Sequence, residues 1–162
     1  MSLEKAFPVK INGAVRELRA PANETLLDCL RRHGHFEVKS GCEKGDCGAC
    51  AVQIDSEPVD SCLVLAWTVE DRSIMTLEGL SDINKPHPLV TAFVEQGAVQ
   101  CGYCTPGIIV AVEALLRETL NPTDDDIALA LSGNLCRCTG YTKIFSAIQQ
   151  AATVLRERGG NG

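Results

Sequence analysis

Eight of the nine cysteines in this chain fall into two groups, and their spacing constrains the fold more than any other feature. The first group, C-x4-C-x2-C-x11-C, consists of Cys42, Cys47, Cys50 and Cys62. The second group, C-x2-C-x31-C-x1-C, consists of Cys101, Cys104, Cys136 and Cys138. The stretch GCEKGDCGAC could form disulfides, bind zinc, or bind iron and sulfide. Because nine is an odd number, a purely disulfide framework would leave at least one thiol over, which favours a metal.

Composition places the chain among ordinary globular proteins. Its 162 residues are 45% hydrophobic and 22% charged, which suits one domain or two small ones. The N-terminal residues contain no signal-peptide core, and no stretch approaches the roughly 18 apolar residues of a membrane span. We therefore expect a soluble, cytoplasmic protein. Clustered cysteines in the cytoplasm usually bind metal. Export together with a partner that carries a signal peptide stays open. A net charge of −6 argues against nucleic acid or an anionic membrane as a partner.

The chain is predicted to form two domains. The stretch SDINKPHP combines turn-forming residues with two prolines and separates the two cysteine groups. We therefore predict a first domain at residues 1–80, a linker at residues 81–87 and a second domain at residues 88–162.

The first half reads as a small mixed sheet crossed by one helix. Asn12-Gly13 is a strong hairpin signal between two short apolar runs, because both turn positions tolerate positive φ. A helix is expected over residues 25–32, with Thr25 as its N-cap and Gly34 as its stop. The runs ACAVQI and SIMTL read as further strands.

The second half has helical periodicity instead. Apolar residues between Pro106 and Leu120 follow the spacing of a buried helical stripe, and Thr105 is expected to cap that helix. Thr123 can cap a second helix with three aspartates in its first turn. Two more helices are expected at about residues 89–96 and 143–156.

The first cysteine group matches the plant-type ligand spacing of a [2Fe–2S] cluster. Gly41, Gly45 and Gly48 suit a loop that wraps around a cluster, because such a loop needs positive φ and needs bare amides near the sulfur atoms. A zinc knuckle would more often show two short C-x2-C pairs. The first group therefore indicates an iron–sulfur site.

The second cysteine group is less diagnostic, and its spacing leaves zinc and iron–sulfur both open. Each of its two cysteine pairs directly precedes a predicted helix. Free amides and the positive end of the helix dipole favour an anionic group at such positions. A four-thiolate iron–sulfur cluster and a zinc tetrathiolate both meet that description.

The remaining reactive side chains are interpreted as structural. Cys29 lies within the first predicted helix without a partner at ligand spacing, which suggests a small buried side chain. His33, His35 and His87 lie near turns without a carboxylate or second histidine at catalytic spacing, so we interpret them as structural or solvent-facing. No nucleophile motif is recognisable, and no substrate-converting centre is expected in this chain.

The sequence closely resembles the small iron–sulfur subunit of the molybdenum hydroxylases, the family of xanthine dehydrogenase and aldehyde oxidoreductase. The segments that carry the resemblance are GCEKGDCGACAV, SCL, AVQCGYCTPGII and SGNLCRCTGYTKI, in that order. The resemblance implies an α+β fold, in which a ferredoxin-like β-grasp domain precedes an all-α four-helix domain. It also implies that each cysteine group ligates one [2Fe–2S] cluster.

Further roles follow from the same resemblance. Gln100 matches a glutamine that hydrogen-bonds the pterin, and Cys138 matches the cluster ligand closest to that pterin. The chain would carry electrons from a molybdopterin centre in a large partner subunit, through both clusters, to FAD or another acceptor in a further subunit. Because this chain ends soon after its last predicted helix, we expect the molybdenum subunit to be a separate polypeptide.

Two other functions compete with this one. An independent two-cluster ferredoxin would use the same ligands, although the helical half would then have no obvious purpose. A zinc-stabilised interaction module would use them without redox chemistry. The substrate of the complex could be a purine, another N-heterocycle, an aldehyde or carbon monoxide.

Overall fold

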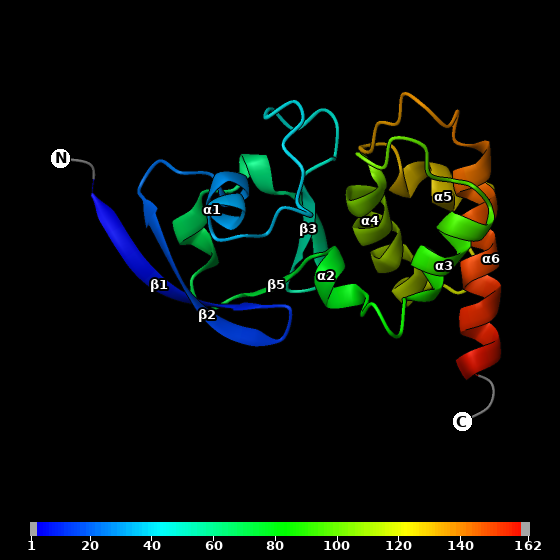
Figure 1. The fold of residues 1–162 in the computed structure, drawn as a ribbon, viewed down its shortest axis with the longest axis horizontal. Helices are drawn as coiled ribbons and strands as arrows, with labels where there is room; N and C mark the ends of the chain where they lie inside the picture. Colours follow the sequence, from blue (N-terminus) through cyan, green and yellow to red (C-terminus); the bar gives the residue numbers. More distant parts are fainter. Residues whose placement is uncertain (1–2, 160–162) are drawn as a thin grey trace.

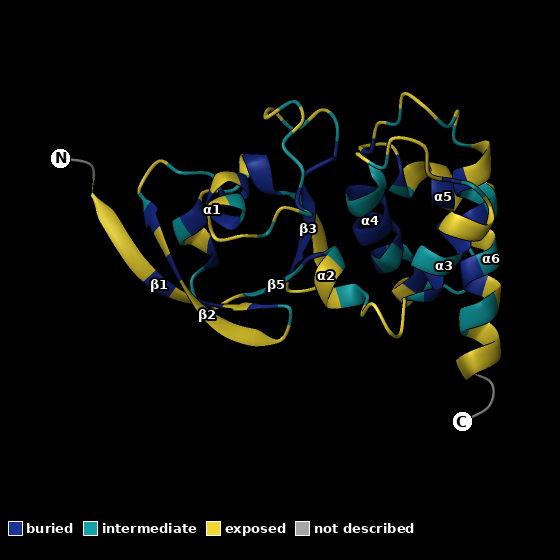
Figure 2. Ribbon diagram, viewed as in Figure 1, coloured by how far each residue is buried: buried dark blue, intermediate teal, exposed yellow. Residues whose placement is uncertain are grey.

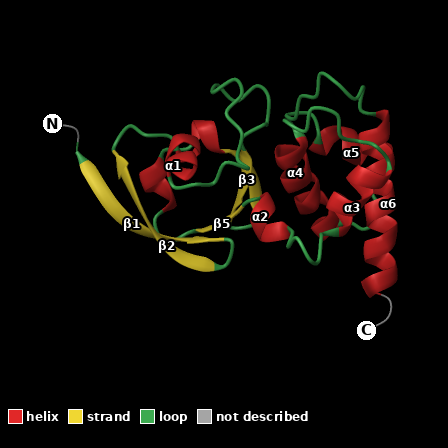
Figure 3. Cartoon of the chain, in the orientation of Figure 1, coloured by secondary structure: helices red, strands yellow, loops and turns green. Residues whose placement is uncertain are grey.

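The computed structural model describes residues 3–159. All of its strands lie in the first half of the chain, whereas most of its α-helices lie in the second half (Figures 1 and 3). The strands are β1 (Glu4–Ile11), β2 (Ala14–Pro21), β3 (Ala51–Ile54), β4 (Glu57–Asp60) and β5 (Ser73–Met75). The helices are α1 (Leu26–Arg32), α2 (Leu77–Leu80), α3 (Pro88–Glu95), α4 (Thr105–Glu118), α5 (Asp124–Ala130) and α6 (Thr142–Gly159). Two short 3₁₀ helices, η1 (Ser61–Leu63) and η2 (Ala66–Val69), join β4 to β5. The predicted fold class, a ferredoxin-like α+β part followed by a helical part, is confirmed.

Two tight hairpins shape the sheet. Asn12 and Gly13 have φ values of 51° and 84°, and Ile11 pairs with Ala14, so the predicted first hairpin is confirmed. Asp55 and Ser56 also have positive φ and join β3 to β4. The strand β4 was not predicted from the sequence. It has four residues, contains a proline and lies at the edge of the sheet.

The five-stranded sheet has the order β2-β1-β5-β3-β4. β1 and β5 run parallel, whereas the other neighbours are antiparallel. The apolar face of α1 packs on this sheet and contributes Leu26, Leu27, Cys29 and Leu30 to the first hydrophobic core. The outward residues of β1 and β2 are exposed (Figure 2).

The helical half has its own core, built around α4. Residues 107–112 of α4 are all buried, and α2, α3 and α5 pack against this helix, whereas α6 packs on α3 and α5 (Figure 2). Leu77 and Leu80 of α2 also pack against this second core. The predicted linker at residues 81–87 and the domain limits on either side of it stay a prediction. No helix within residues 3–159 has the length and apolar character to cross a membrane.

The starts of two helices test the predicted caps. The Thr123 hydroxyl accepts a hydrogen bond from the Asp126 amide at 3.2 Å. The Asp126 carboxylate accepts one from the Thr123 amide at 2.8 Å in return, which forms a capping box. The predicted cap at Thr105 is wrong. Cys104 already has helical dihedral angles and its carbonyl accepts the first intrahelical bond from Ile108 at 3.0 Å, so Thr105 lies inside the first turn.

The two halves meet where β3 packs against α4. The side chain of Gln53 is buried and donates to the Val110 carbonyl at 2.9 Å, while Arg117 donates to Gln53 at 3.1 Å. Gly107 of α4 lies directly on the backbone of residues 41–50, here called the first cysteine loop. A Cβ atom at Gly107 would lie 2.1 Å from the Gly48 carbonyl oxygen. This close approach of two backbones leaves no room for any side chain.

The contact at Gly107 gives a first prediction. Gly107→Ala should force α4 away from the first cysteine loop and lower the stability of the chain by about 1–3 kcal/mol, since the obstructing atom belongs to the backbone. Thermal unfolding of the metal-loaded chain measures the loss. Gly133→Ala is the matched control, because a Cβ atom there meets nothing within 4 Å. Equal melting temperatures for the two variants would contradict the proposed close packing.

Candidate iron–sulfur centres

The first cysteine group comes together through one loop and one hairpin. Residues 33–50, between α1 and β3, carry three of its members, and Cys62 lies in η1. The β3–β4 hairpin pairs Ala51 with Asp60 and thereby returns the chain to Cys50. The Ser61 hydroxyl donates to the Cys50 carbonyl at 2.7 Å and fixes that return. The x11 spacing between Cys50 and Cys62 is therefore the length of a tight hairpin plus one turn.

The thiols of this group lie in two pairs. Cys42 lies beside Cys47, whose sulfur accepts a hydrogen bond from the Cys42 amide at 3.4 Å. Cys50 lies beside Cys62, and both are buried. The Asp46 amide donates to the Cys42 sulfur at 3.2 Å. The loop thus directs backbone amides at sulfur, as the glycine-rich sequence predicts.

The electrostatic surroundings of the two pairs differ. Hydrogen bonds from the backbone amides of Lys44 and Asp46 lower the pKa of the Cys42 thiol to about 7. Burial, in contrast, raises the pKa of the Cys50 thiol to about 12. A buried thiol of this kind becomes a thiolate readily only when a metal ion supplies compensating positive charge.

The second cysteine group lies at the starts of two helices, as predicted. Cys101 and Cys104 directly precede α4, and Cys136 and Cys138 lie in the loop before α6. Its thiols are again paired, since the sulfur of Cys138 lies 3.6 Å from that of Cys101, and Cys104 lies beside Cys136. The first pair is exposed and the second is half-buried.

Polar groups around the half-buried pair hold it in place. The Cys136 amide donates to the Tyr141 hydroxyl at 2.8 Å, and the Thr139 hydroxyl donates to the Cys136 sulfur at 3.1 Å. Burial alone would raise the pKa of Cys136, but the hydrogen bonds from Thr139 and the neighbouring backbone lower it overall. Burial raises the pKa of the Cys104 thiol to about 12.

The pairing of the thiols bears on whether each cysteine group binds one metal ion or two. Two thiolates at about 2.3 Å from one tetrahedral ion lie about 3.7 Å apart, which fits the 3.6 Å between Cys101 and Cys138 and excludes a disulfide bond there. A single zinc ion would draw all four sulfur atoms together. Within residues 3–159, however, no three thiols of either group have sulfur atoms mutually within 4.8 Å. The distance in the Cys101–Cys138 pair fits one ion held by that pair, and the other thiols are paired in the same way.

The two groups face each other across the junction between the halves. A cavity of about 410 Å³ is lined by cysteines from both groups. The three cysteine-bearing loops lie along one edge of the molecule, where the cyan loop faces the green and orange ones (Figure 1). The Leu135 amide donates to the Cys47 carbonyl at 2.9 Å, and the Asn134 side chain donates to the Gly48 carbonyl at 3.1 Å. The loop of one group is therefore hydrogen-bonded directly to the loop of the other.

The remaining predicted residues lie as follows. Gln100 is exposed, immediately before the exposed Cys101. Cys29 is fully buried in the first core, where burial raises the pKa of its thiol to about 11. His87 is the N-cap of α3, and its ring nitrogen accepts a hydrogen bond from the Leu89 amide at 3.3 Å. His35 was interpreted as a residue without a carboxylate at catalytic spacing. In the structure, however, Glu37 Oε1 lies 3.3 Å from His35 Nδ1.

Comparisons with known proteins agree with this geometry. Residues 9–76 match a family model described as a 2Fe-2S iron-sulfur cluster binding domain, and residues 76–149 match one described as a [2Fe-2S] binding domain. The nicotinate dehydrogenase small FeS subunit of Eubacterium barkeri is 48% identical over 88% of this chain and 92% of that protein. The xanthine dehydrogenase iron-sulfur-binding subunit of Escherichia coli O157:H7 is 44% identical over 85% of this chain and 88% of that subunit.

This chain belongs to the family of small iron–sulfur subunits of the molybdenum hydroxylases. Among solved structures, quinoline 2-oxidoreductase from Pseudomonas putida 86 matches with a TM-score of 0.92 and 40% identity, over 98% of this chain and 99% of the matched chain. Aldehyde oxidoreductase from Desulfovibrio desulfuricans matches with a TM-score of 0.91 and 40% identity, over 94% of this chain but 17% of that chain. This chain therefore matches one part of that longer polypeptide.

The separation of the two groups gives a second prediction. Cys138→Ser removes one ligand from the second group only, so it should alter or abolish one of the two EPR signals of the reduced protein and leave the other unchanged. Cys29→Ser is the matched control, because Cys29 lies in neither group, and it should leave both signals intact. Equal loss of both signals in the Cys138 variant would contradict the division into two independent sites.

Proposed function

We propose that this chain is the electron-transfer subunit of a multi-subunit molybdenum-containing hydroxylase or dehydrogenase. The observation that carries the proposal is the pair of thiol sites in one chain, whose ligand loops share a direct hydrogen bond. Membership of the small-subunit family supports it. When bound, a [2Fe–2S] cluster supplies one-electron redox chemistry, so two sites in series suit an enzyme that must discharge two electrons stepwise.

We assign one cluster to each cysteine group. The first site would be ligated by Cys42, Cys47, Cys50 and Cys62. The second site would be ligated by Cys101, Cys104, Cys136 and Cys138. The amides aimed at the sulfurs of the first site and the helix start at Cys104 would offset the negative charge of the thiolates.

The exposed side of the second site would face the molybdenum subunit. Cys101 and Cys138 are its exposed pair, and Gln100 is exposed beside them. We propose that the Gln100 amide hydrogen-bonds the pterin of the partner and that Cys138 is the ligand nearest to it. A partner surface would cover these residues and exclude water from the second site.

The contact between the loops offers a direct connection between the two sites. From the Cys47 carbonyl, one hydrogen bond of 2.9 Å leads to the Leu135 amide, and Leu135 is covalently joined to Cys136. We propose that electrons pass between the two sites by this route and leave the first site toward FAD or another acceptor in a further subunit. We also propose that the complex is cytoplasmic and that its substrate is selected by the molybdenum subunit.

The relay gives a third prediction. A tagged copy of this chain, expressed in its native host, should co-purify with a larger molybdenum-containing chain. In that complex, the substrate should reduce both clusters. In the Cys138→Ser complex, the substrate should no longer reduce the first cluster at the normal rate, although dithionite should still reduce it. Stopped-flow absorbance and freeze-quench EPR measure both reactions, with Cys29→Ser as the control.

Two outcomes would contradict the proposal. Normal substrate reduction of the first cluster in the Cys138→Ser complex would show that the second site is not on the route. Co-purification of the tagged chain without any molybdenum-containing chain, together with reversible reduction by unrelated reductases, would favour an independent two-cluster ferredoxin.

A further inference from the structure

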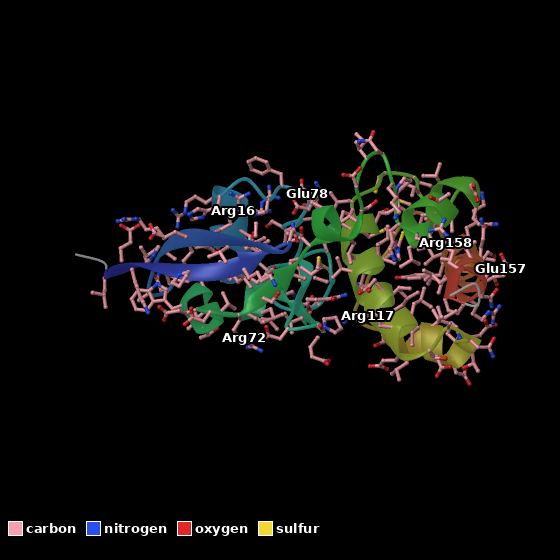
Figure 4. The ribbon with its side chains drawn as sticks, turned by 90° about the horizontal axis from the view of Figure 1, so that it is seen from below. Arg16, Arg72, Glu78, Arg117, Glu157 and Arg158 are labelled. Atoms are coloured by element: carbon pink, nitrogen blue, oxygen red, sulfur yellow. The ribbon has the colours of Figure 1, made fainter. Side chains whose placement is uncertain are left out.

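A third group of ligand-type side chains lies away from both cysteine groups. His35, Glu37 and Glu78 each offer one donor atom, and these three atoms all lie within 4.8 Å of one another. His35 and Glu37 lie in the segment that leads from α1 into the first cysteine loop, whereas Glu78 lies on α2. Figure 4 shows Glu78 near the boundary between the sheet and the helices.

Glu37 is the unusual member of this group. Its side chain is only 10% exposed. One carboxylate oxygen, Oε1, accepts a hydrogen bond from the Thr76 hydroxyl at 2.6 Å and lies 3.3 Å from His35 Nδ1. The other oxygen, Oε2, is buried and has no hydrogen-bond partner. A buried carboxylate oxygen without a partner is costly, so its presence here points to a positively charged ligand.

The Glu78 carboxylate places a second negative charge beside the buried Glu37 carboxylate. Although Glu78 is an exposed residue, desolvation of its carboxyl group and the nearby Glu37 carboxylate raise its pKa. Two carboxylates in contact can be neutralised by one shared proton or by one cation. The imidazole of His35 beside them adds a nitrogen ligand, which a metal cation uses and a shared proton does not need.

We propose that His35, Glu37 and Glu78 form a binding site for a divalent transition-metal ion of the zinc type. One imidazole nitrogen and two carboxylate oxygens are ligands that zinc takes, with a water molecule completing a tetrahedral set. The Thr76 hydroxyl orients the Glu37 carboxylate, and Thr76 is itself held by Asn12, whose Oδ1 accepts from the Thr76 amide at 2.9 Å. Such supporting hydrogen bonds are typical of metal sites.

The position of this site suggests what the ion does. It joins the segment before the first cysteine loop to α2, and Leu77 and Leu80 of α2 pack against the helical core. An ion held there would cross-link the entry of the first cysteine loop to the start of the connection between the two halves. Its role would therefore be structural, and it would stabilise the relative placement of the two cluster sites.

Zinc binding to the cluster-loaded chain tests this fourth prediction. The full chain, with its iron content verified, is dialysed against Zn²⁺ at neutral pH, and zinc and iron are counted by mass spectrometry. The wild-type chain should take up one zinc ion without losing iron, and Glu78→Gln should abolish that uptake. Glu17→Gln is the matched control, because it removes the same charge from an exposed position on β2 and should bind zinc normally.

Other outcomes distinguish the alternatives. Glu37→Gln should also abolish zinc uptake, and zinc should raise the melting temperature of the wild-type and Glu17→Gln chains but not that of Glu78→Gln. Because Glu78 is exposed, its variant should fold normally, and an unchanged cluster absorbance verifies this. If the wild-type chain takes up no more zinc than Glu78→Gln, the carboxylates share a proton instead and the proposal is wrong. Zinc uptake only with loss of iron would also overturn it.

Discussion

The pairing of thiols at about the distance that one tetrahedral metal ion requires is the constraint on which this structure depends. The sulfur atoms of Cys101 and Cys138 lie 3.6 Å apart, and in each group the thiols lie in two neighbouring pairs. The β3–β4 hairpin returns Cys62 to Cys50, and the starts of α4 and α6 bring Cys104 to Cys136. A hairpin in the first half and two helix starts in the second half thus bring paired cysteines together.

A second requirement is that the two sites lie close enough for electron transfer, and the backbone contacts between the halves meet it. Gly107 allows α4 to lie on the Gly48 carbonyl, and Asn134 donates to that same carbonyl. The Leu135 amide then reaches Cys47. Since any side chain at Gly107 would separate these backbones, the same contact that packs the halves together also joins the two ligand loops. Stability and function therefore depend on one small region.

Local signals in the sequence predicted the elements that local physics determines. The Asn12-Gly13 hairpin and the Thr123 cap depend on residues within a few positions of each other, and both were recognisable. Contacts between distant segments were not. The hydrogen bond from Gln53 to Val110 has no sequence signal. Glu78 could not be assigned to His35 from the sequence, because the sheet and α2 bring them together. The cysteine spacings were the exception, since several ligands of one site must converge wherever they lie in the chain.

The central claim is that each cysteine group holds two iron ions and not one zinc ion. Counting iron, acid-labile sulfide and zinc in the purified chain, after dialysis against a chelator that removes weakly held metal, tests it most directly. The account predicts about four iron ions and about four sulfides per chain, as two [2Fe–2S] clusters require. About two zinc ions per chain with no acid-labile sulfide would contradict it.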